Sequence, residues 1–184
     1  MSTKRYKAGG FADPATLPRG EHGRVLCRQC GEEVQTGRIT FCSDDCVHQW
    51  RLRTDGAYLR RQVWNRDRGW CDICGMNTEA LRRRLITRRQ AMIRRHAIHM
   101  ARRWNEGRPY RPHEQSGGTF FNAFLLRVGG KKLLHRWHTS LWDADHIVPV
   151  CEGGGQSGLS NIRTLCLWCH GKATAALAAR RAAK

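Results

Sequence analysis

The nine cysteines of this chain fall into four close pairs and one single residue, and this spacing restricts the fold more than any other feature of the sequence. Two thiolates separated by a short turn can bind one zinc ion, which takes four ligands at about 2.3 Å in structural sites. Ordinary buried thiols seldom occur as four tight pairs. The eight paired cysteines therefore predict two structural zinc sites, while the ninth, Cys151, has no partner in this scheme.

The first predicted zinc site is compact in the sequence, whereas the second joins distant segments. The first site consists of Cys27, Cys30, Cys42 and Cys46. The second site consists of Cys71, Cys74, Cys166 and Cys169. Ser43 is expected to cap a helix whose first turn contains the last cysteine of the first set. The halves of the second set are more than ninety residues apart, so a shared zinc ion would tie two remote parts of the chain together.

The charge of the chain favours a polyanionic partner. There are 33 Lys and Arg residues against 15 Asp and Glu residues, which gives a net charge of +18. Basic side chains held on one surface repel one another until phosphates neutralise them, so nucleic acid is the first candidate partner. No stretch approaches about 18 consecutive apolar residues, and no apolar run follows the first lysines, so we expect an intracellular protein without a membrane span.

Over half of this excess charge lies in residues 80–111, most of which are expected to form a helix over about 81–104. Apolar residues recur there at helical spacing, namely Leu81, Leu85, Met92, Ile93, Ala97, Met100 and Trp104. Arginines fill much of the remainder, namely Arg82, Arg83, Arg84, Arg88, Arg89, Arg94, Arg95, Arg102 and Arg103. No acidic residue lies between 82 and 103, so we interpret the helix as a contact to the DNA backbone. A solvated helix face and a localisation signal are the alternatives.

After this helix, Gly129 and Gly130 separate two further segments with apolar residues. Glycine pairs between two strand-like segments are typical of tight turns. The sequence therefore predicts a β-hairpin over about 119–141.

Residues 142–170 carry the groups that metal-assisted hydrolysis of a phosphodiester requires. A strand-like segment, a glycine-rich turn and a second short strand that runs into a helix predict two strands and a helix clamped by the second zinc ion. On this frame Asp145 and His170 can hold one divalent cation, and His146 can take a proton from water near neutral pH. The amide of Asn161 can bond two backbone groups and so hold the loop that aims His146. The alternative is that these side chains only pack or complete zinc sites.

These residues resemble the HNH endonucleases with a ββα-metal core. The resemblance is strongest over 142–172, where Asp-His-Ile-Val-Pro-Val, Glu-Gly-Gly-Gly, Leu-x-Asn and Leu-Cys-x-x-Cys-His follow one another. Residues 41–55 also resemble the segment that precedes the HNH core in the nuclease domain of a eukaryotic annealing helicase and its bacterial relatives. The resemblance implies Mg²⁺ or a similar ion such as Mn²⁺ as cofactor, with these roles: cation ligands Asp145 and His170, general base His146, orienting residue Asn161.

Taken together, these features predict an α+β fold, with a small zinc-stabilised ββα-metal (HNH) core, an N-terminal four-cysteine zinc finger and a basic helical insertion. The expected organisation is a mobile tail over 1–23, a finger with a connecting helix over 24–69, and an HNH nuclease domain over 70–184 with the insertion at about 80–140. The expected activity is that of a DNA endonuclease with two structural Zn²⁺ ions and one catalytic divalent cation. The alternatives are a zinc-dependent DNA-binding module without catalysis and a protein that binds or cleaves RNA. The sequence leaves the oligomeric state open.

Overall fold

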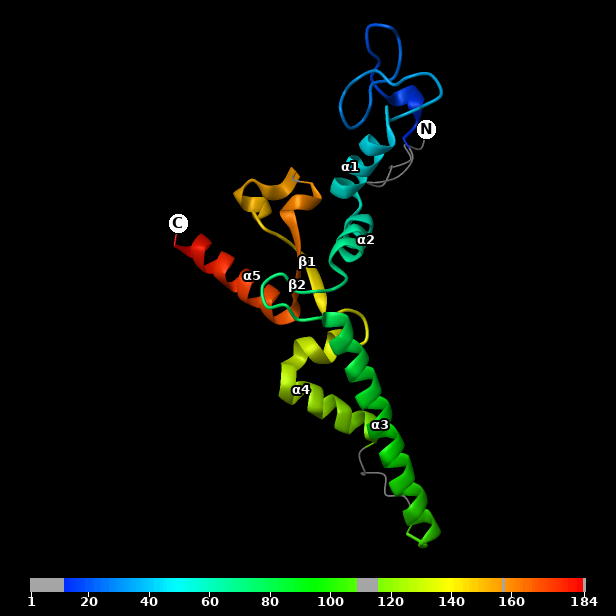
Figure 1. Ribbon diagram of the computed structural model, residues 1–184, viewed down its shortest axis with the longest axis vertical. Helices are drawn as coiled ribbons and strands as arrows, with labels where there is room; N and C mark the ends of the chain where they lie inside the picture. Colours follow the sequence, from blue (N-terminus) through cyan, green and yellow to red (C-terminus); the bar gives the residue numbers. More distant parts are fainter. Residues whose placement is uncertain (1–11, 109–115, 157, 184) are drawn as a thin grey trace, which may run out of the picture. The chain divides into compact units, whose positions relative to one another are not determined.

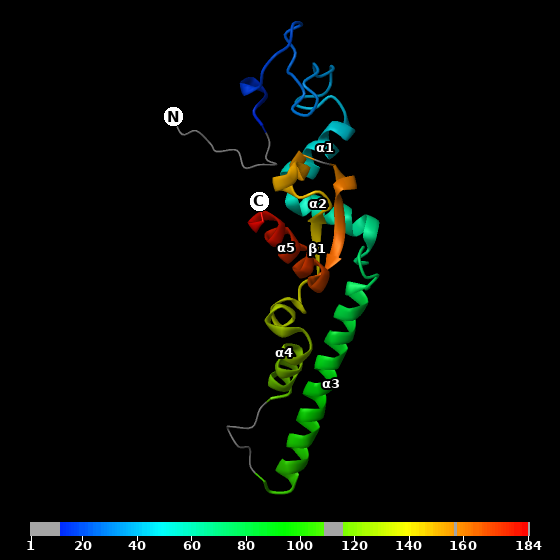
Figure 2. The same ribbon diagram turned by 90° about the vertical axis from the view of Figure 1, so that its left-hand side faces the viewer.

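The computed structural model describes residues 12–108, 116–156 and 158–183. The chain divides into two compact units, of which unit 1 comprises Met1–Arg66 and His146–Arg163, and unit 2 comprises Asp67–Asp145 and Thr164–Lys184. The α-helices and strands of the described residues are labelled in Figure 1, and Figure 2 shows the same ribbon from another side. They are α1 (Asp44–Thr54), α2 (Gly56–Asp67), α3 (Thr78–Asn105), α4 (Gly117–Arg136), β1 (Trp142–His146), β2 (Ile162–Cys166) and α5 (Leu167–Ala182).

The two strands form the frame of the predicted core. β1 and β2 pair in a two-stranded antiparallel sheet, and α5 begins at the residue that follows β2. The predicted α+β fold with two strands and a following helix is therefore confirmed. None of the helices in the described part of the chain combines the length and the apolar character that crossing a membrane would require.

Local capping explains where the two helices of unit 1 begin. The side chain of Ser43 accepts a hydrogen bond from the N–H of Cys46, as the sequence predicted. The carboxylate of Asp55 accepts a hydrogen bond from the N–H of Tyr58 and starts α2 in the same way. Each cap satisfies a backbone donor that the first turn of a helix leaves unpaired, so both helix starts are encoded locally.

The described part of the N-terminal tail is tied to the finger. Arg19 pairs with Val25 in an antiparallel bridge. The N–H of His22 donates a hydrogen bond to the Glu33 carboxylate at 2.8 Å. Residues 1–11 of the tail predicted over 1–23 lie outside the described residues, and the mobility of the tail stays a prediction.

The apolar core of unit 2 lies mainly between α3 and α4, which run side by side (Figure 1 and Figure 2). Its buried residues are Leu85, Phe121, Leu125, Leu133, Leu141 and Leu167. The helix that was predicted over 81–104 is confirmed by α3. Its apolar side is buried only in the first half, at Leu85, whereas Ile93 and Trp104 are exposed.

The β-hairpin predicted over 119–141 is wrong, because most of this segment forms α4. Phe121 and Leu125 are both fully buried, and their separation of one helical turn fits a helix rather than a strand that alternates between two faces. The glycine pair does interrupt the regular backbone, since Gly130 has φ 66° and ψ −168°. The interruption is a kink between two helical segments instead of a turn between two strands.

Candidate functional site

Both sets of four cysteines come together as predicted. One cluster, Cys27, Cys30, Cys42 and Cys46, lies in unit 1, and the other, Cys71, Cys74, Cys166 and Cys169, lies in unit 2. Within each cluster the four Sγ atoms lie within 4.8 Å of one another. Four sulfurs around one zinc ion would be about 3.8 Å apart, and the Sγ atoms of Cys74 and Cys166 are separated by 3.8 Å. Each cluster therefore suits one structural zinc ion.

The pKa values of the thiols differ within each cluster. Burial opposes the ionisation of Cys27, but backbone N–H groups outweigh burial and lower its pKa to about 6. The neighbouring sulfurs, first that of Cys46, raise the pKa of Cys42 to about 12. In the second cluster the pKa of Cys71 is lowered to about 7, since backbone N–H groups again outweigh burial. In each cluster the pKa of one thiol is thus shifted towards the thiolate form, which is the form that binds a divalent cation.

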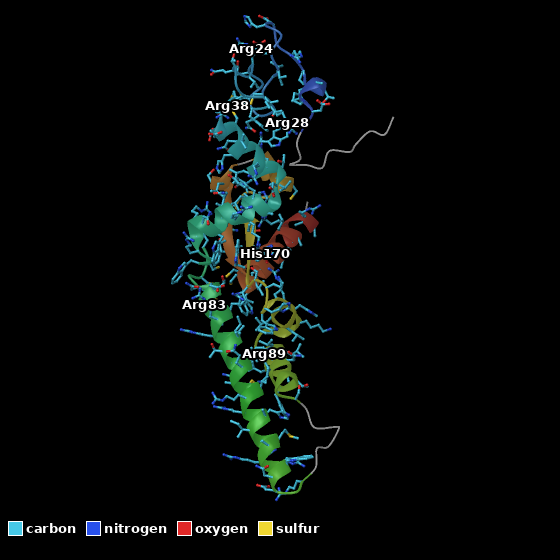
Figure 3. The ribbon with its side chains drawn as sticks, turned by 90° about the vertical axis from the view of Figure 1, so that its right-hand side faces the viewer. Arg24, Arg28, Arg38, Arg83, Arg89 and His170 are labelled. Atoms are coloured by element: carbon cyan, nitrogen blue, oxygen red, sulfur yellow. The ribbon has the colours of Figure 1, made fainter. Side chains whose placement is uncertain are left out.

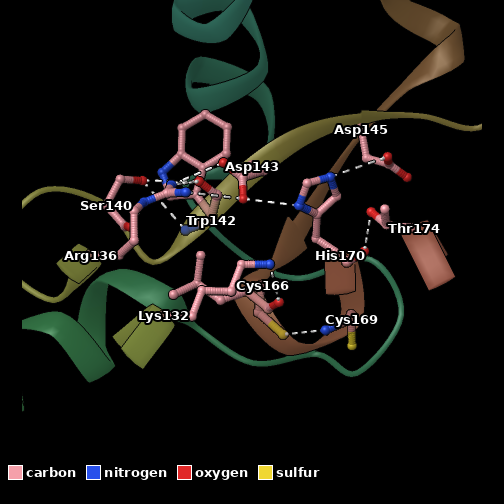
Figure 4. A network of polar contacts seen from close by, with 11 residues as sticks. Lys132, Arg136, Ser140, Trp142, Asp143, Asp145, Cys166, Cys169, His170 and Thr174 are labelled. Carbon is pink, nitrogen blue, oxygen red and sulfur yellow. Dashed lines mark hydrogen bonds and ion pairs between the residues drawn. The ribbon is translucent and has the colours of Figure 1, made fainter. Parts of the chain in front are cut away.

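Asp145 and His170 lie together in unit 2. Asp145 is in β1 and His170 is in the first turns of α5, and Oδ1 of the aspartate lies 3.9 Å from Nε2 of the histidine (Figure 4). Two ligands of one small divalent cation, each at about 2.0–2.2 Å, are at most about 4.4 Å apart. The two side chains are therefore close enough to share a cation, and an oxygen with an imidazole nitrogen is a donor set that such a cation accepts.

Sequence reasoning missed a second carboxylate beside the same histidine. Oδ2 of Asp143 lies 3.1 Å from Nδ1 of His170, so the imidazole ring stands between two aspartates (Figure 4). Arg136 at the end of α4 binds Asp143 through both carboxylate oxygens, at 2.9 and 3.4 Å. The signal for this arrangement was present in the sequence, because two aspartates separated by one residue lie on the same face of a strand.

Asn161 belongs to unit 1, where its amide holds the loop that follows β1. Its Oδ1 accepts a hydrogen bond from the N–H of Val148 at 2.8 Å. Its Nδ2 donates to the carbonyl oxygens of Val148 and Gly154, at 3.0 and 3.1 Å. The loop passes so close to itself that a Cβ on Gly154 would collide with the Val148 carbonyl. The amide thus bonds backbone groups as expected, while the orienting role of Asn161 stays a prediction.

His146 is the last residue of β1 and is half-buried. It follows Asp145 directly in the chain, and the loop that Asn161 holds begins one residue later, where the N–H of Ile147 donates to the carbonyl of Asn161 at 2.8 Å. The position of His146 at the start of a fixed loop is compatible with the proton transfer expected of it.

The nine arginines of α3 differ in the contacts that they make. Glu79 binds Arg82 and Arg83, at 2.9 and 3.0 Å. The hydrogen bond from Arg82, and then that from Arg83, hold the pKa of the Glu79 carboxyl below its usual value, although burial opposes this. The guanidinium of Arg88 lies over the ring of Phe124, 4.1 Å from its centroid. These arginines stabilise the helix and its contact with α4, apart from any role with a partner.

A second group of these arginines is also exposed on α3, namely Arg84, Arg94, Arg95 and Arg102. Arg83 and Arg88 are exposed as well, but they contact Glu79 and Phe124. Arg89 is also exposed but lies over the ring of Trp137, and Arg103 is half-buried. Figure 3 shows Arg83 and Arg89 on this helix, with side chains extending from it at several levels. The exposed group is the part of the arginine set that is best placed to meet a polyanion.

The described site residues can now be compared with known proteins. The family model described as HNH endonuclease matches residues 130–176. The chain carries an HNH endonuclease domain. Asp145, His146, Asn161 and His170 all lie inside the matched segment, as does the newly found Asp143. The HNH domain takes in the end of α4, both strands and the first part of α5.

Relatives of the whole chain support the same family. The chain is 31% identical over 170 residues to the DNA annealing helicase and endonuclease ZRANB3 of Mus musculus, covering 88% of this chain. It is 30% identical over 168 residues to the proteins of the same name from Bos taurus and Homo sapiens, covering 86% of this chain. It spans only 14% of the length of these relatives. No solved structure matches the chain significantly. These matches support a function of the nuclease type.

Proposed function

We propose that this chain is an HNH-type DNA endonuclease that hydrolyses phosphodiester bonds with one divalent cation and a histidine general base. The observation that carries the proposal is the approach of Asp145 to His170, at 3.9 Å, inside the segment that matches the HNH family. The similarity to relatives named as DNA helicases and endonucleases favours DNA over RNA as the substrate.

In this proposal each side chain has a separate task. A cation held by Asp145 and His170, Mg²⁺ or Mn²⁺, would stabilise the charge that develops on the phosphate and on the leaving oxygen. The imidazole of His146 would accept a proton from the attacking water. Asn161 would fix the path of the loop that leaves β1 and thereby the direction of His146. The two four-cysteine clusters would hold the frame through structural zinc.

Cleavage of plasmid DNA by the zinc-loaded chain, with Mg²⁺ or Mn²⁺ added, tests the proposal. We expect the wild type to nick or linearise the plasmid. We expect His146→Ala to bind the same DNA with unchanged affinity and to cleave it about 10²- to 10⁴-fold more slowly, because the general base is lost. His138→Ala is the matched control, since this exposed histidine lies outside the proposed site. Binding by the wild type without cleavage in either cation would support the non-catalytic DNA-binding module instead.

We further propose that DNA binding depends most on the exposed arginines of α3. Replacing Arg84, Arg94, Arg95 and Arg102 by Gln should weaken DNA binding and reduce the dependence of log Kd on log salt concentration by about 0.9 for each phosphate that is no longer neutralised. Single-turnover cleavage at saturating enzyme should change little. Replacing Arg82 and Arg83, which Glu79 already binds, is the matched control and should change the salt slope less. If log Kd depends on log salt concentration equally in all variants, these arginines of α3 do not neutralise DNA phosphates.

A further inference from the structure

A chain of charged contacts leads from α4 to the imidazole of His170 in unit 2. The ring stands between two carboxylates, with Nδ1 at 3.1 Å from Asp143 and Nε2 at 3.9 Å from Asp145 (Figure 4). The side chains of Asp143 and Asp145 are only 19% and 20% exposed, so water weakens these interactions less than at an open surface. The two ring nitrogens therefore meet different partners, and only the Nε2 side faces the aspartate that is proposed to bind the cation.

Asp143 is itself held in place. Arg136 donates to both of its carboxylate oxygens, from Nη2 at 2.9 Å and from Nη1 at 3.4 Å. The same guanidinium donates to two backbone carbonyls, those of Ser140 at 3.1 Å and Trp142 at 3.2 Å. A planar guanidinium with four such contacts has little freedom to turn, so it fixes the position of the carboxylate that it binds.

We infer that Asp143, held by Arg136, is a positioning residue that fixes the ring of His170 with its proton on Nδ1 and its lone pair on Nε2. The inference rests on the proposed function of Asp145 and His170 as cation ligands. A carboxylate beside Nδ1 favours the tautomer that is protonated there, and histidines that bind metals generally have such a second partner. The Nδ1 atom is buried, and the approach of Asp143 departs from the direction of a hydrogen bond, so charge and distance rather than a directed bond define the contact.

The geometry argues against Asp143 as a third cation ligand. Its carboxylate lies beside Nδ1, whereas a cation shared with Asp145 would be at Nε2, on the other side of the ring. Its two oxygens are already engaged by the guanidinium of Arg136. A positively charged group this close also disfavours a cation at Asp143 itself.

Two measurements on the full zinc-loaded chain test the inference. The first is the tautomer of His170, read from its ring ¹⁵N chemical shifts at mildly alkaline pH without any added cation, with His170→Gln identifying its signals. We expect the Nδ1-protonated form in the wild type and a shift towards the Nε2-protonated form in Asp143→Asn. An unchanged tautomer would overturn the positioning role. This readout is independent of cleavage, so failure of the wild type to cut DNA would sink the proposed function and leave this result standing.

The second measurement is the affinity for Mn²⁺, by calorimetry. Loss of a partner of this kind typically weakens metal binding by about 10- to 100-fold. We expect such a loss in both Asp143→Asn and Arg136→Gln, with partial recovery in Asp143→Glu, which keeps the carboxylate. Arg136→Gln is the deciding variant, because removing a nearby positive charge would by electrostatics alone strengthen Mn²⁺ binding.

Tighter Mn²⁺ binding in Arg136→Gln would therefore contradict the inference and favour Asp143 as a direct ligand. Glu106→Gln, which removes an exposed carboxylate at the end of α3, is the charge control and should leave both readouts unchanged. A melting transition like that of the wild type in each variant separates positioning from a loss of folding.

Discussion

Unit 2 contains two regions that are held together by different means. The zinc-clamped segment, defined by Cys71, Cys74, Cys166 and Cys169, has few buried apolar side chains besides Leu165 and the cysteines themselves. The α3–α4 pair, by contrast, has no cysteine in its described residues and packs Leu85, Phe121 and Leu125 between its helices. The difference teaches that small, remote segments meet at four thiols that could hold a metal ion, whereas long helices supply enough surface for apolar burial.

The four-cysteine cluster suits segments that are far apart in the sequence. The two cysteine pairs of the zinc-clamped segment are separated in the sequence by the whole of the α3–α4 pair, so a zinc ion bound by all four cysteines would join two remote segments. One backbone hydrogen bond between the segments runs from Asp72 to Thr164, at 2.9 Å. Four bonds to one metal ion would link these short segments without a large apolar core.

The largest expected effect comes from breaking the zinc-clamped segment. Cys71→Ser removes a buried ligand of the cluster, and structural zinc supplies roughly 10–16 kcal/mol of apparent free energy in small sites. This is comparable to or larger than the whole stability of a typical domain, about 5–15 kcal/mol, so the segment should unfold. Zinc content and thermal unfolding measure the effect.

Cys151→Ser is the matched control, because Cys151 is exposed and belongs to neither cluster. It should retain two zinc ions and the melting temperature of the wild type. A Cys71→Ser variant that kept both would remove the basis for zinc in this segment.

An intermediate effect is expected in the α3–α4 pair. Leu125→Ala should destabilise the zinc-loaded chain by about 2–5 kcal/mol, because the side chain is completely buried and its removal leaves a cavity. The neighbouring Leu126 is 44% exposed, and Leu126→Ala should change the free energy of unfolding by roughly 0.5 kcal/mol or less. Chemical unfolding measures both, and zinc content should stay unchanged. Equal losses at the two positions would mean that apolar burial does not hold this region.

The smallest effect is expected where the two regions join. The side chain of Asn77 accepts a hydrogen bond from the N–H of Ala80, at 2.8 Å, and starts α3 a few residues after Cys74. Asn77→Ala should lower the free energy of unfolding by about 1 kcal/mol. Asn77→Asp should keep the wild-type value, because the side chains of Asn and Asp both accept a hydrogen bond from the same N–H. Asn105→Ala, at the exposed far end of α3, should lower the free energy of unfolding by less than Asn77→Ala does. Chemical unfolding in excess zinc checks the order of the three variants.

Several elements could be predicted because their causes are local. The cap of α1 at Ser43 and the extent of α3 follow from the residues in and beside each helix. The cysteine pairs follow from the chemistry of one ligand type. The β-hairpin prediction failed at Gly130 because a glycine pair marks an interruption without saying what lies on either side of it. The burial of Phe121 and Leu125 against α3 decided in favour of a helix, and that contact is not local.

By itself, the sequence determined which candidate groups this protein has: two sets of four cysteines, and Asp145, His146, Asn161 and His170 within the segment that matches the HNH family. Only the tertiary structure decided which neighbours those groups meet. It placed Asp143 beside His170 and Arg136 beside Asp143, and it paired Arg82 and Arg83 of α3 with Glu79. The reason is physical: ligand chemistry belongs to a residue type and its spacing, whereas the partner of a side chain depends on which distant element packs against it.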